Sequence, residues 1–203
     1  MRKFLNRIMF CTIMVAICWS ILLLKDRNAL NNELIRFHVV ANSDNPEDQT
    51  IKLTVRDVVL NSLKSDLNSI SNVSDAKAYL QENLPKIQDL VDQTLEKLGV
   101  DGGSHVSLCK EIFDVRHYET FSLPAGIYHS LRIVIGEGMG KNWWCVSFPM
   151  LCIPATTDGF VETAADAGLS EPLVQTLSGN EGYHLRFYFL DQLGKLETVF
   201  FKA

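Results

Sequence analysis

Apolar and polar residues recur with two different periods along the chain, and these periods separate helical segments from strands. Residues 34–41, "LIRFHVVA", are rich in β-branched and aromatic side chains, which predicts a strand. Residues 46–66 and 74–98 repeat apolar side chains at steps of three and four positions, which predicts two amphipathic helices. Pro85 lies inside the second pattern and predicts a kink or a break in that helix.

Strand-forming residues dominate the second half of the chain. Strands are predicted within residues 104–122, 130–136 and 143–148. The glycines and prolines of residues 154–182 predict an irregular or partly helical excursion. Residues 183–201, "YHLRFYFLDQLGKLETVFF", are again rich in β-forming side chains and predict a strand pair that turns near Gln192–Lys195.

The order of these elements predicts the fold class. One strand, two helices and then mainly strands are typical of an α+β domain, with helices packed on one face of a mostly antiparallel sheet. We place this domain at residues 34–203, after an N-terminal segment of different composition.

That N-terminal segment contains an uncharged run of 17 residues at 8–24, with charged residues on both sides. The apolar part of a signal peptide is about 7–15 residues long, and a membrane-spanning helix needs about 17–25. Residues 1–24 are therefore predicted to be a cleaved signal peptide or a membrane anchor, followed by a linker at 25–33. The lack of a clear small-residue cleavage site favours the anchor.

Both interpretations place the domain outside the cytoplasm, because the cationic end of such a segment stays inside. A buried core helix is the third alternative, and the charges at both ends of the run argue against it. Without residues 1–24, the formal net charge changes from −5 to −8, since that segment holds three basic residues and no acid. Nucleic acid and anionic lipid headgroups are therefore unfavourable partners.

Three cysteines follow the leader, namely Cys109, Cys145 and Cys152. A compartment outside the cytoplasm permits disulfides. Cys145 and Cys152 are the favoured pair, because Pro149 between them allows the turn that brings their Cα atoms within about 7 Å. The alternative is that both are buried free thiols.

The stretch 136–152, "GEGMGKNWWCVSFPMLC", concentrates glycine, tryptophan and cysteine. Its glycines do not form a dinucleotide-binding turn, because no helix-opening glycine follows at the required spacing. No histidine lies near Cys145 in the sequence to activate a thiolate, and the chain has no closely spaced metal ligands. We therefore predict no catalytic residue, no metal site and no cofactor.

Trp143 and Trp144 are adjacent, so on a strand their side chains point to opposite faces of the sheet. One of them can stack on a sugar or pack against a partner protein. The alternative is that one lies in the core and the other under a loop. A cell-wall (peptidoglycan) binding or hydrolysing domain is thus an alternative function for this chain.

Three segments together resemble one known family. They are "IRFHVVANSDNPEDQTIKLTVRDVVL" (35–60), "LPAGIYHSLRIVIGEGMGKNWWCVSFPMLC" (123–152) and "LRFYFLDQL" (185–193), and they are similar to stage II sporulation protein R of endospore-forming bacteria. One difference is Met150, where the family motif usually has a second proline. The resemblance extends over nearly the whole chain after the leader.

The resemblance implies a secreted signalling protein and no enzymatic activity. Members of this family are made in the forespore and exported toward the space between the forespore and mother-cell membranes. There they activate a membrane-embedded aspartic protease, stage II sporulation protein GA, which cleaves pro-sigma-E and starts the mother-cell programme. The expected partners are that protease and, if the leader is uncleaved, the membrane through residues 8–24. No nucleic acid is expected.

We expect the partner surface to include two polar or glycine-rich segments of these motifs, where a purely structural role would favour apolar residues. The expected surface residues are Asn42, Ser43, Asp44, Glu137, Asn142, Trp143 and Trp144.

Overall fold

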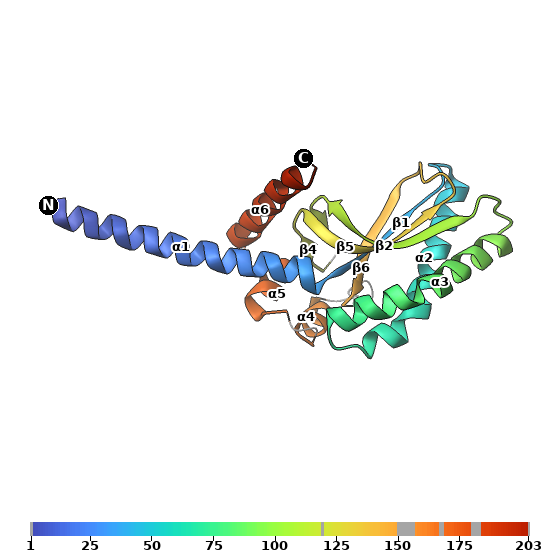
Figure 1. Ribbon diagram of the computed structural model, residues 1–203, viewed down its shortest axis with the longest axis horizontal. Helices are drawn as coiled ribbons and strands as arrows, with labels where there is room; N and C mark the ends of the chain where they lie inside the picture. Colours follow the sequence, from blue (N-terminus) through green and yellow to red (C-terminus); the bar gives the residue numbers. More distant parts are fainter. Residues whose placement is uncertain (1, 119, 150–156, 167–168, 180–183, 203) are drawn as a thin grey trace.

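The computed structural model of the chain describes residues 2–118, 120–149, 157–166, 169–179 and 184–202. In chain order these residues form α1 (Arg2–Glu33), β1 (Ile35–Val40), α2 (Pro46–Asn68), α3 (Val73–Lys97), β2 (Ser104–Phe113), β3 (Arg116–His117), β4 (Ser122–Leu123), β5 (Gly126–Ile135), β6 (Asn142–Phe148), α4 (Thr157–Asp166), α5 (Glu171–Leu177) and α6 (His184–Lys202) (Figure 1). This arrangement confirms the predicted α+β fold class.

The larger sheet has the strand order β2-β5-β1-β6. The central strand β1 pairs in parallel with β5, which places Phe37 beside Leu131, and antiparallel with β6, which places Phe37 beside Cys145. The third pairing, between β2 and β5, is antiparallel. Parallel strands cannot be joined by a short turn and need a long crossover connection. Here the segment between β1 and β5, which includes α2, α3 and β2, provides that connection.

Helices α2 and α3 pack on one face of this sheet, as predicted (Figure 1). The fully buried members of this first core are Ile35, Phe37, Val39, Val55, Val59, Ala76, Leu80, Val91, Leu131 and Ile133. Each of these side chains except that of Ala76 stabilises the fold by about 1.5–3 kcal/mol relative to an exposed one. Helix α3 continues through Pro85 without a break, and Asn72 caps it by accepting a hydrogen bond from Asp75 N at 2.9 Å.

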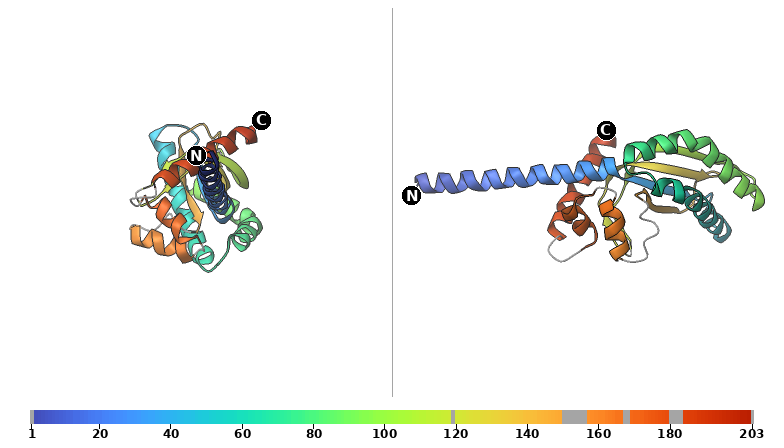
Figure 2. Two further views of the ribbon diagram at one scale, coloured as in Figure 1. Left: turned by 90° about the vertical axis from the view of Figure 1, so that its left-hand side faces the viewer. Right: turned by 90° about the horizontal axis from the view of Figure 1, so that it is seen from below.

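A second core joins the last turns of α1 to α4, α5, α6 and the sheet. Its members are Leu23, Leu30, Leu34, Phe113, Phe121, Leu123, Tyr128, Val146, Phe160, Ala164, Leu169, Leu173, Val174, Leu177 and Leu190. The sheet residues of this group come from the ends of the strands nearest α1, so these helices close the sheet at that end (Figure 2).

The predicted strand pair at residues 183–201 is wrong, because His184–Lys202 form α6. Gly194, which was expected in the turn, lies within the helix. A Cβ atom there would come within 1.7 Å of the carbonyl oxygen of Ala125, so the glycine lets the helix backbone lie directly against the start of β5. Local β propensity yields here to packing between distant parts of the chain.

Helix α1 runs without interruption from the apolar segment into the domain. Residues 25–33, predicted as a linker, form its last turns, where Asp26, Arg27 and Leu30 are buried. The earlier turns project from the domain with their apolar side chains exposed (Figure 2). The segment Lys3–Glu33 is long and apolar enough to cross a membrane, a property that signal sequences share.

Candidate partner surface

The two polar segments identified in the sequence meet at one end of the sheet. Residues 41–49 follow β1 and residues 136–142 connect β5 to β6; together they are called the corner below. The parallel pairing of β1 and β5 brings the carboxyl ends of these strands side by side. Because β1 runs away from α1, the corner lies at the opposite end of the domain from α1 (Figures 1 and 2).

Two side chains of the first segment bind the backbone of the second. The Oδ1 atom of Asn42 accepts a hydrogen bond from Glu137 N at 3.1 Å, and the Oδ1 atom of Asp44 accepts one from Lys141 N at 2.7 Å. Each such hydrogen bond contributes about 0.5–1.5 kcal/mol to stability. Asn42 and Asp44 therefore hold the shape of the 136–142 turn.

Glycines of the turn permit this close approach. Gly136 has a φ of +55°, and a Cβ atom there would lie 2.4 Å from Oδ1 of Asn42. A Cβ atom at Gly140 would lie 2.2 Å from the carbonyl oxygen of Ser43, while Gly140 N donates to the carbonyl oxygen of Ala41 at 2.9 Å. The glycine-rich sequence thus serves backbone contact within the protein, which agrees with the rejection of a dinucleotide turn.

Two charged groups, Asp48 of the corner and the neighbouring Lys52 of α2, complete its network. The Asp48 carboxylate accepts hydrogen bonds from Ser43 Oγ at 2.5 Å and Asn42 Nδ2 at 3.1 Å, and these bonds hold the pKa of Asp48 below its usual value. The buried Lys52 donates from Nζ to the carbonyl oxygen of Lys141 at 3.0 Å, and burial lowers its pKa. The corner is therefore held in one conformation by internal bonds.

The side chains that the corner presents to solvent differ from those that build it. Glu137, Lys141 and Asn142 are exposed, and Met139 is 77% exposed. Of the expected surface residues, Asn42 and Ser43 are half-buried and use their polar groups internally. The outward face of the corner is thus a small patch of mixed charge around one apolar side chain.

The two tryptophans lie on opposite faces of the sheet. Trp143 packs on Phe37, with ring centroids 5.9 Å apart, and the Arg56 guanidinium lies 4.9 Å from a Trp143 ring. Trp144 stacks on His38 on the other face, with centroids 3.6 Å apart. Both side chains are half-buried, and they cannot form one flat platform for a sugar.

Under Trp144 lies a polar cluster that the sequence did not reveal. The His38 ring is 4% exposed, and its Nδ1 atom lies 3.2 Å from both carboxylate oxygens of Glu111. Burial raises the pKa of Glu111, whereas the hydrogen bond with His38 and the charge of the nearby Arg132 lower it, so the net shift is downward. Trp144 covers the His38 ring of this pair, whereas Glu111 is half-buried.

Beside it, Arg36 is fully buried without a carboxylate partner among the ion pairs of the described residues. Its guanidinium lies 4.3 Å from the ring centroid of Phe113, and Nη2 donates to the Tyr118 hydroxyl at 2.8 Å. Nε donates to the carbonyl oxygen of Cys145 at 3.2 Å. Burial lowers the pKa of Arg36, and the surrounding aromatic rings partly offset that cost.

Sequence reasoning missed this cluster because Arg36 and His38 alternate with apolar residues on β1, the pattern of a solvent-facing side of a strand. The signal that could have located it is the aromatic content of residues 113–128, which supplies Phe113, Tyr118 and Tyr128.

Neither of the two described cysteines of the domain, Cys109 and Cys145, has the properties of a nucleophile. Burial raises the pKa of the Cys109 thiol, which disfavours the reactive thiolate. Cys145 is buried and disulfide-bonded. Cys152 lies outside the described residues, so its pairing with Cys145 stays a prediction.

With this geometry in place, comparison with known proteins identifies the family. The family model described as Stage II sporulation protein R (spore_II_R) matches residues 31–158, which is more than half of the chain. The chain belongs to the stage II sporulation protein R family. The resemblance inferred from the sequence motifs is therefore confirmed, and membership implies a role in sporulation.

One curated relative is Stage II sporulation protein R of Bacillus subtilis (strain 168), which is 34% identical over 128 residues. The aligned part covers 63% of this chain and 57% of that relative, so the chain spans little more than half of the relative's length. No solved structure matches the chain.

The range matched by the stage II sporulation protein R family contains the whole corner and the Arg36 cluster. Helices α5 and α6 and nearly all of α1 lie outside it, as does the segment 185–193 that also contributed to the resemblance. The matched part thus contains the sheet with α2 and α3, whereas α5 and α6 lie beyond it.

Proposed function

We propose that this member of the stage II sporulation protein R family is a forespore signalling protein that activates the membrane-embedded sigma-E processing protease. It acts outside the cytoplasm, held by α1 in the forespore membrane, and leads to pro-sigma-E cleavage in the mother cell. The proposal combines the role implied by the family with the position of the corner in this fold.

The observation that carries the proposal is the placement of the corner at the end of the domain opposite α1 (Figure 1). If α1 crosses the forespore membrane, β1 points away from that membrane and the corner faces the membrane across the gap. The corner then lies at the end of the domain that faces the mother-cell membrane, together with the connection between α3 and β2, and the extracytoplasmic part of a protease in that membrane can contact it (Figure 1).

The construction of the corner suits docking without rearrangement. Its backbone is fixed by Asn42, Asp44 and the close contacts at Gly136 and Gly140. A surface that is ordered before binding loses less conformational entropy on association. The exposed Glu137 and Lys141 can pair with opposite charges on the partner, and Met139 can fill an apolar depression there.

The chemistry of the described residues supports a signalling role over catalysis. The His38 ring of the His38–Glu111 pair is buried beneath Trp144, and the raised pKa of Cys109 disfavours a thiolate. The acid–base pair and the free thiol therefore lack the access or the ionisation that general acid–base or nucleophilic catalysis needs.

The test is co-expression of the full chain with the protease and pro-sigma-E in a host that does not sporulate, with processing followed by immunoblot. The variants are Glu137→Lys, Lys141→Glu and Met139→Ser, all at exposed positions. The matched control is Lys64→Glu, an exposed charge reversal on α2 that lies 18 residues beyond Pro46, about 27 Å along the helix.

We expect wild type and Lys64→Glu to give processed sigma-E. At least one corner variant should reduce processing about fivefold or more at equal protein level, the effect of losing roughly 1 kcal/mol of binding. Full processing by all three corner variants contradicts the corner as the contact surface. Absence of processing with the wild-type chain contradicts the proposed function itself.

A further inference from the structure

Helix α6 exposes a long apolar stripe to solvent. Its members are Leu185 (61% exposed), Tyr188 (56%), Leu196 (58%), Val199 (64%) and Phe200 (80%). Successive members are three or eight positions apart, except for the adjacent Val199 and Phe200, and Phe200 lies four positions after Leu196. All five therefore share one side of the helix. An exposed apolar surface of this length marks a contact with a partner or a membrane.

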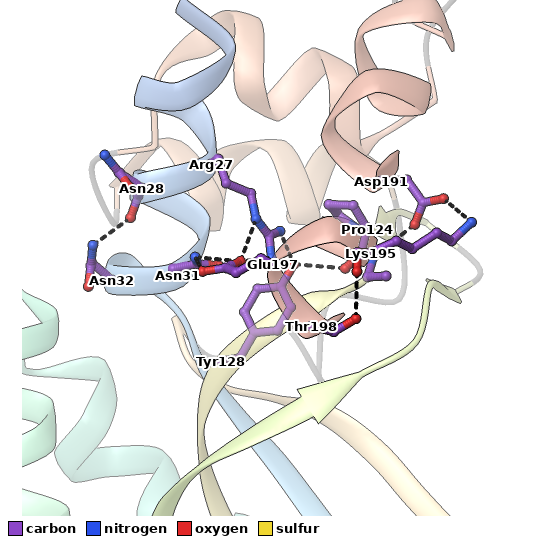
Figure 3. A network of polar contacts seen from close by, with 11 residues as sticks. Arg27, Asn28, Asn31, Asn32, Pro124, Tyr128, Asp191, Lys195, Glu197 and Thr198 are labelled. Atoms are coloured by element: carbon purple, nitrogen blue, oxygen red, sulfur yellow. Dashed lines mark hydrogen bonds and ion pairs between the residues drawn. The ribbon is translucent and has the colours of Figure 1, made fainter. Parts of the chain in front are cut away.

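The opposite side of α6 is fixed to the domain by polar contacts (Figure 3). The Glu197 carboxylate accepts hydrogen bonds from Arg27 Nη2 at 2.7 Å and from Asn31 Nδ2 at 2.9 Å. Asp191 accepts one from Ala125 N at 3.0 Å. Because these partners are buried or half-buried, α6 cannot roll to hide its apolar stripe without breaking them.

Contacts with α1 define the level of α6 along that helix. The Phe189 ring lies 4.8 Å from the ring of Trp19, which belongs to the uncharged run 8–24, and Arg186 forms an ion pair with Asp26 just beyond that run. Trp19 is five residues before Leu24, or about 8 Å along the helix. The amino-terminal half of α6 therefore lies beside the end of the apolar run.

We propose that α6 is an interfacial helix, which lies on the outer surface of the same membrane that α1 crosses. A helix of this kind buries its apolar side about 5–10 Å into the boundary between headgroups and acyl chains. Phe189 contacts Trp19, which lies about 8 Å along α1 from the end of the apolar run, and this distance agrees with that depth. Trp and Tyr are also the side chains that are enriched at this boundary. This inference rests on the membrane placement in the proposed function.

The depth of α6 decreases toward its carboxyl end. Glu197 contacts Arg27 and Asn31, and Asn31 is seven residues beyond Leu24, or about 10 Å along α1. Tyr188, next to Phe189, is thus placed deepest, whereas Phe200 lies nearer the outer limit of the headgroups. The acids Asp191 and Glu197 are paired within the protein, so apolar contact rather than charge holds the helix on the lipid.

Photocrosslinking in a lipid bilayer tests this placement. The full chain, with benzoylphenylalanine at one position at a time, is reconstituted in nanodiscs of phosphatidylcholine and phosphatidylglycerol, irradiated and analysed for lipid adducts by mass spectrometry. The test positions are Tyr188 and Phe200. Ile13 in the apolar run is the positive control, and Leu98, 44% exposed at the far end of α3, is the negative one.

We expect adducts at Tyr188 to approach those at Ile13, to exceed those at Leu98 several-fold, and to exceed those at Phe200. Adducts at Ile13 with none above the Leu98 level at Tyr188 overturn the placement of α6 alone. A lack of adducts at Ile13 overturns the membrane placement of α1 as well. Crosslinks from Tyr188 to a second copy of the chain overturn the proposal in favour of a contact between copies.

Discussion

Gly136 and Asn42 lie so close together that a Cβ atom at Gly136 would come within 2.4 Å of Asn42 Oδ1. Gly136→Ala therefore combines a steric clash with a φ of +55°, which disfavours any side chain. We expect this variant to lose about 2–4 kcal/mol of unfolding free energy, measured by urea denaturation.

Gly99→Ala separates the two causes. Gly99 also has a positive φ, +70°, but a Cβ atom there meets nothing within 4 Å, so we expect a loss of only about 1 kcal/mol. The double variant Gly136→Ala with Asn42→Ala should be less destabilised than the sum of its single variants, because removal of the amide relieves the clash. Strict additivity would contradict the clash.

The stability of the corner should depend on pH through Asp48. Hydrogen bonds from Ser43 and Asn42 lower the pKa of Asp48 in the folded protein, so its contribution is complete above the unfolded pKa of about 3.9. That contribution is lost as the pH falls through the lower folded value. We expect Asp48→Asn to lessen the decrease in urea midpoint between pH 5 and pH 2.

Ser43→Ala provides the internal check for this effect, since Ser43 Oγ is the larger cause of the pKa shift of Asp48. It should lessen the acid decrease in the same direction as Asp48→Asn. Two variants that add fully in the double variant would indicate that the two groups act separately.

Attachment of α6 should depend on Glu197. Its truncation to alanine leaves Arg27, which is 5% exposed, without its carboxylate, and breaking a buried or half-buried ion pair is costly. We expect about 1–3 kcal/mol less protection of α6 amides in hydrogen exchange. Amides of β1 and β5 around Phe37 and Leu131 should keep their protection.

Gln192→Ala is the matched control on the same helix, because Gln192 is half-buried and its side chain makes no hydrogen bond among those between described residues. If Gln192→Ala loosens α6 as much as Glu197→Ala does, the ion pair is not what holds the helix.

The lone cation Arg36 should contribute through its volume more than through its charge. Arg36→Ala removes the side chain that packs over Phe113 and leaves a cavity, for which we expect a loss of about 3–5 kcal/mol. Arg36→Met fills most of that space and avoids the cost of burying a charge, so its loss should be clearly smaller. Equal losses, measured by urea denaturation, would show that the bonds to Tyr118 and Cys145 decide instead.

The pairing of Cys145 with Cys152 should protect both from alkylation. In the denatured full chain without reductant, we expect iodoacetamide to modify Cys11, Cys18 and Cys109, which are free. Modification of all five cysteines should require prior reduction. Peptide mass spectrometry checks this, and alkylation of Cys152 before reduction would contradict the predicted pair.

Sequence periodicity was sufficient for elements whose burial is regular. The apolar spacing that predicts α2 and α3 places Val55, Val59, Leu80 and Val91 in the first core, where all four are fully buried. For α6 it was insufficient, because its packing depends on contacts between residues far apart in the sequence, among them the close approach of Gly194 to Ala125 and the ion pair of Glu197 with Arg27. Aromatic residues of this segment, such as Phe187 and Phe189, favour strands in general, but here they pack from a helix against the second core.

The candidate site was predictable in its segments but not in its roles. Both segments of the corner were identified from the sequence, since they are polar or glycine-rich where a purely structural role would favour apolar residues. Their function as internal braces was hidden, because Asn42 and Glu137 are separated by 95 residues and meet only after β1 and β5 pair. Arg36 was overlooked because a charged residue on a strand normally has its side chain exposed to solvent, whereas this one is fully buried.

Because α1 passes almost directly into β1, the distance from the apolar run of α1 to the far end of β1 is fixed. Glu33 ends the helix and Ile35 begins the strand, so one residue separates two rigid elements. From Lys25 to Val40 the chain extends at most about 36 Å. A protein with a flexible tether could search a wide gap, whereas this one reaches only as far as its own length. Under the proposed function, it therefore reports that two membranes have come within a set distance of each other.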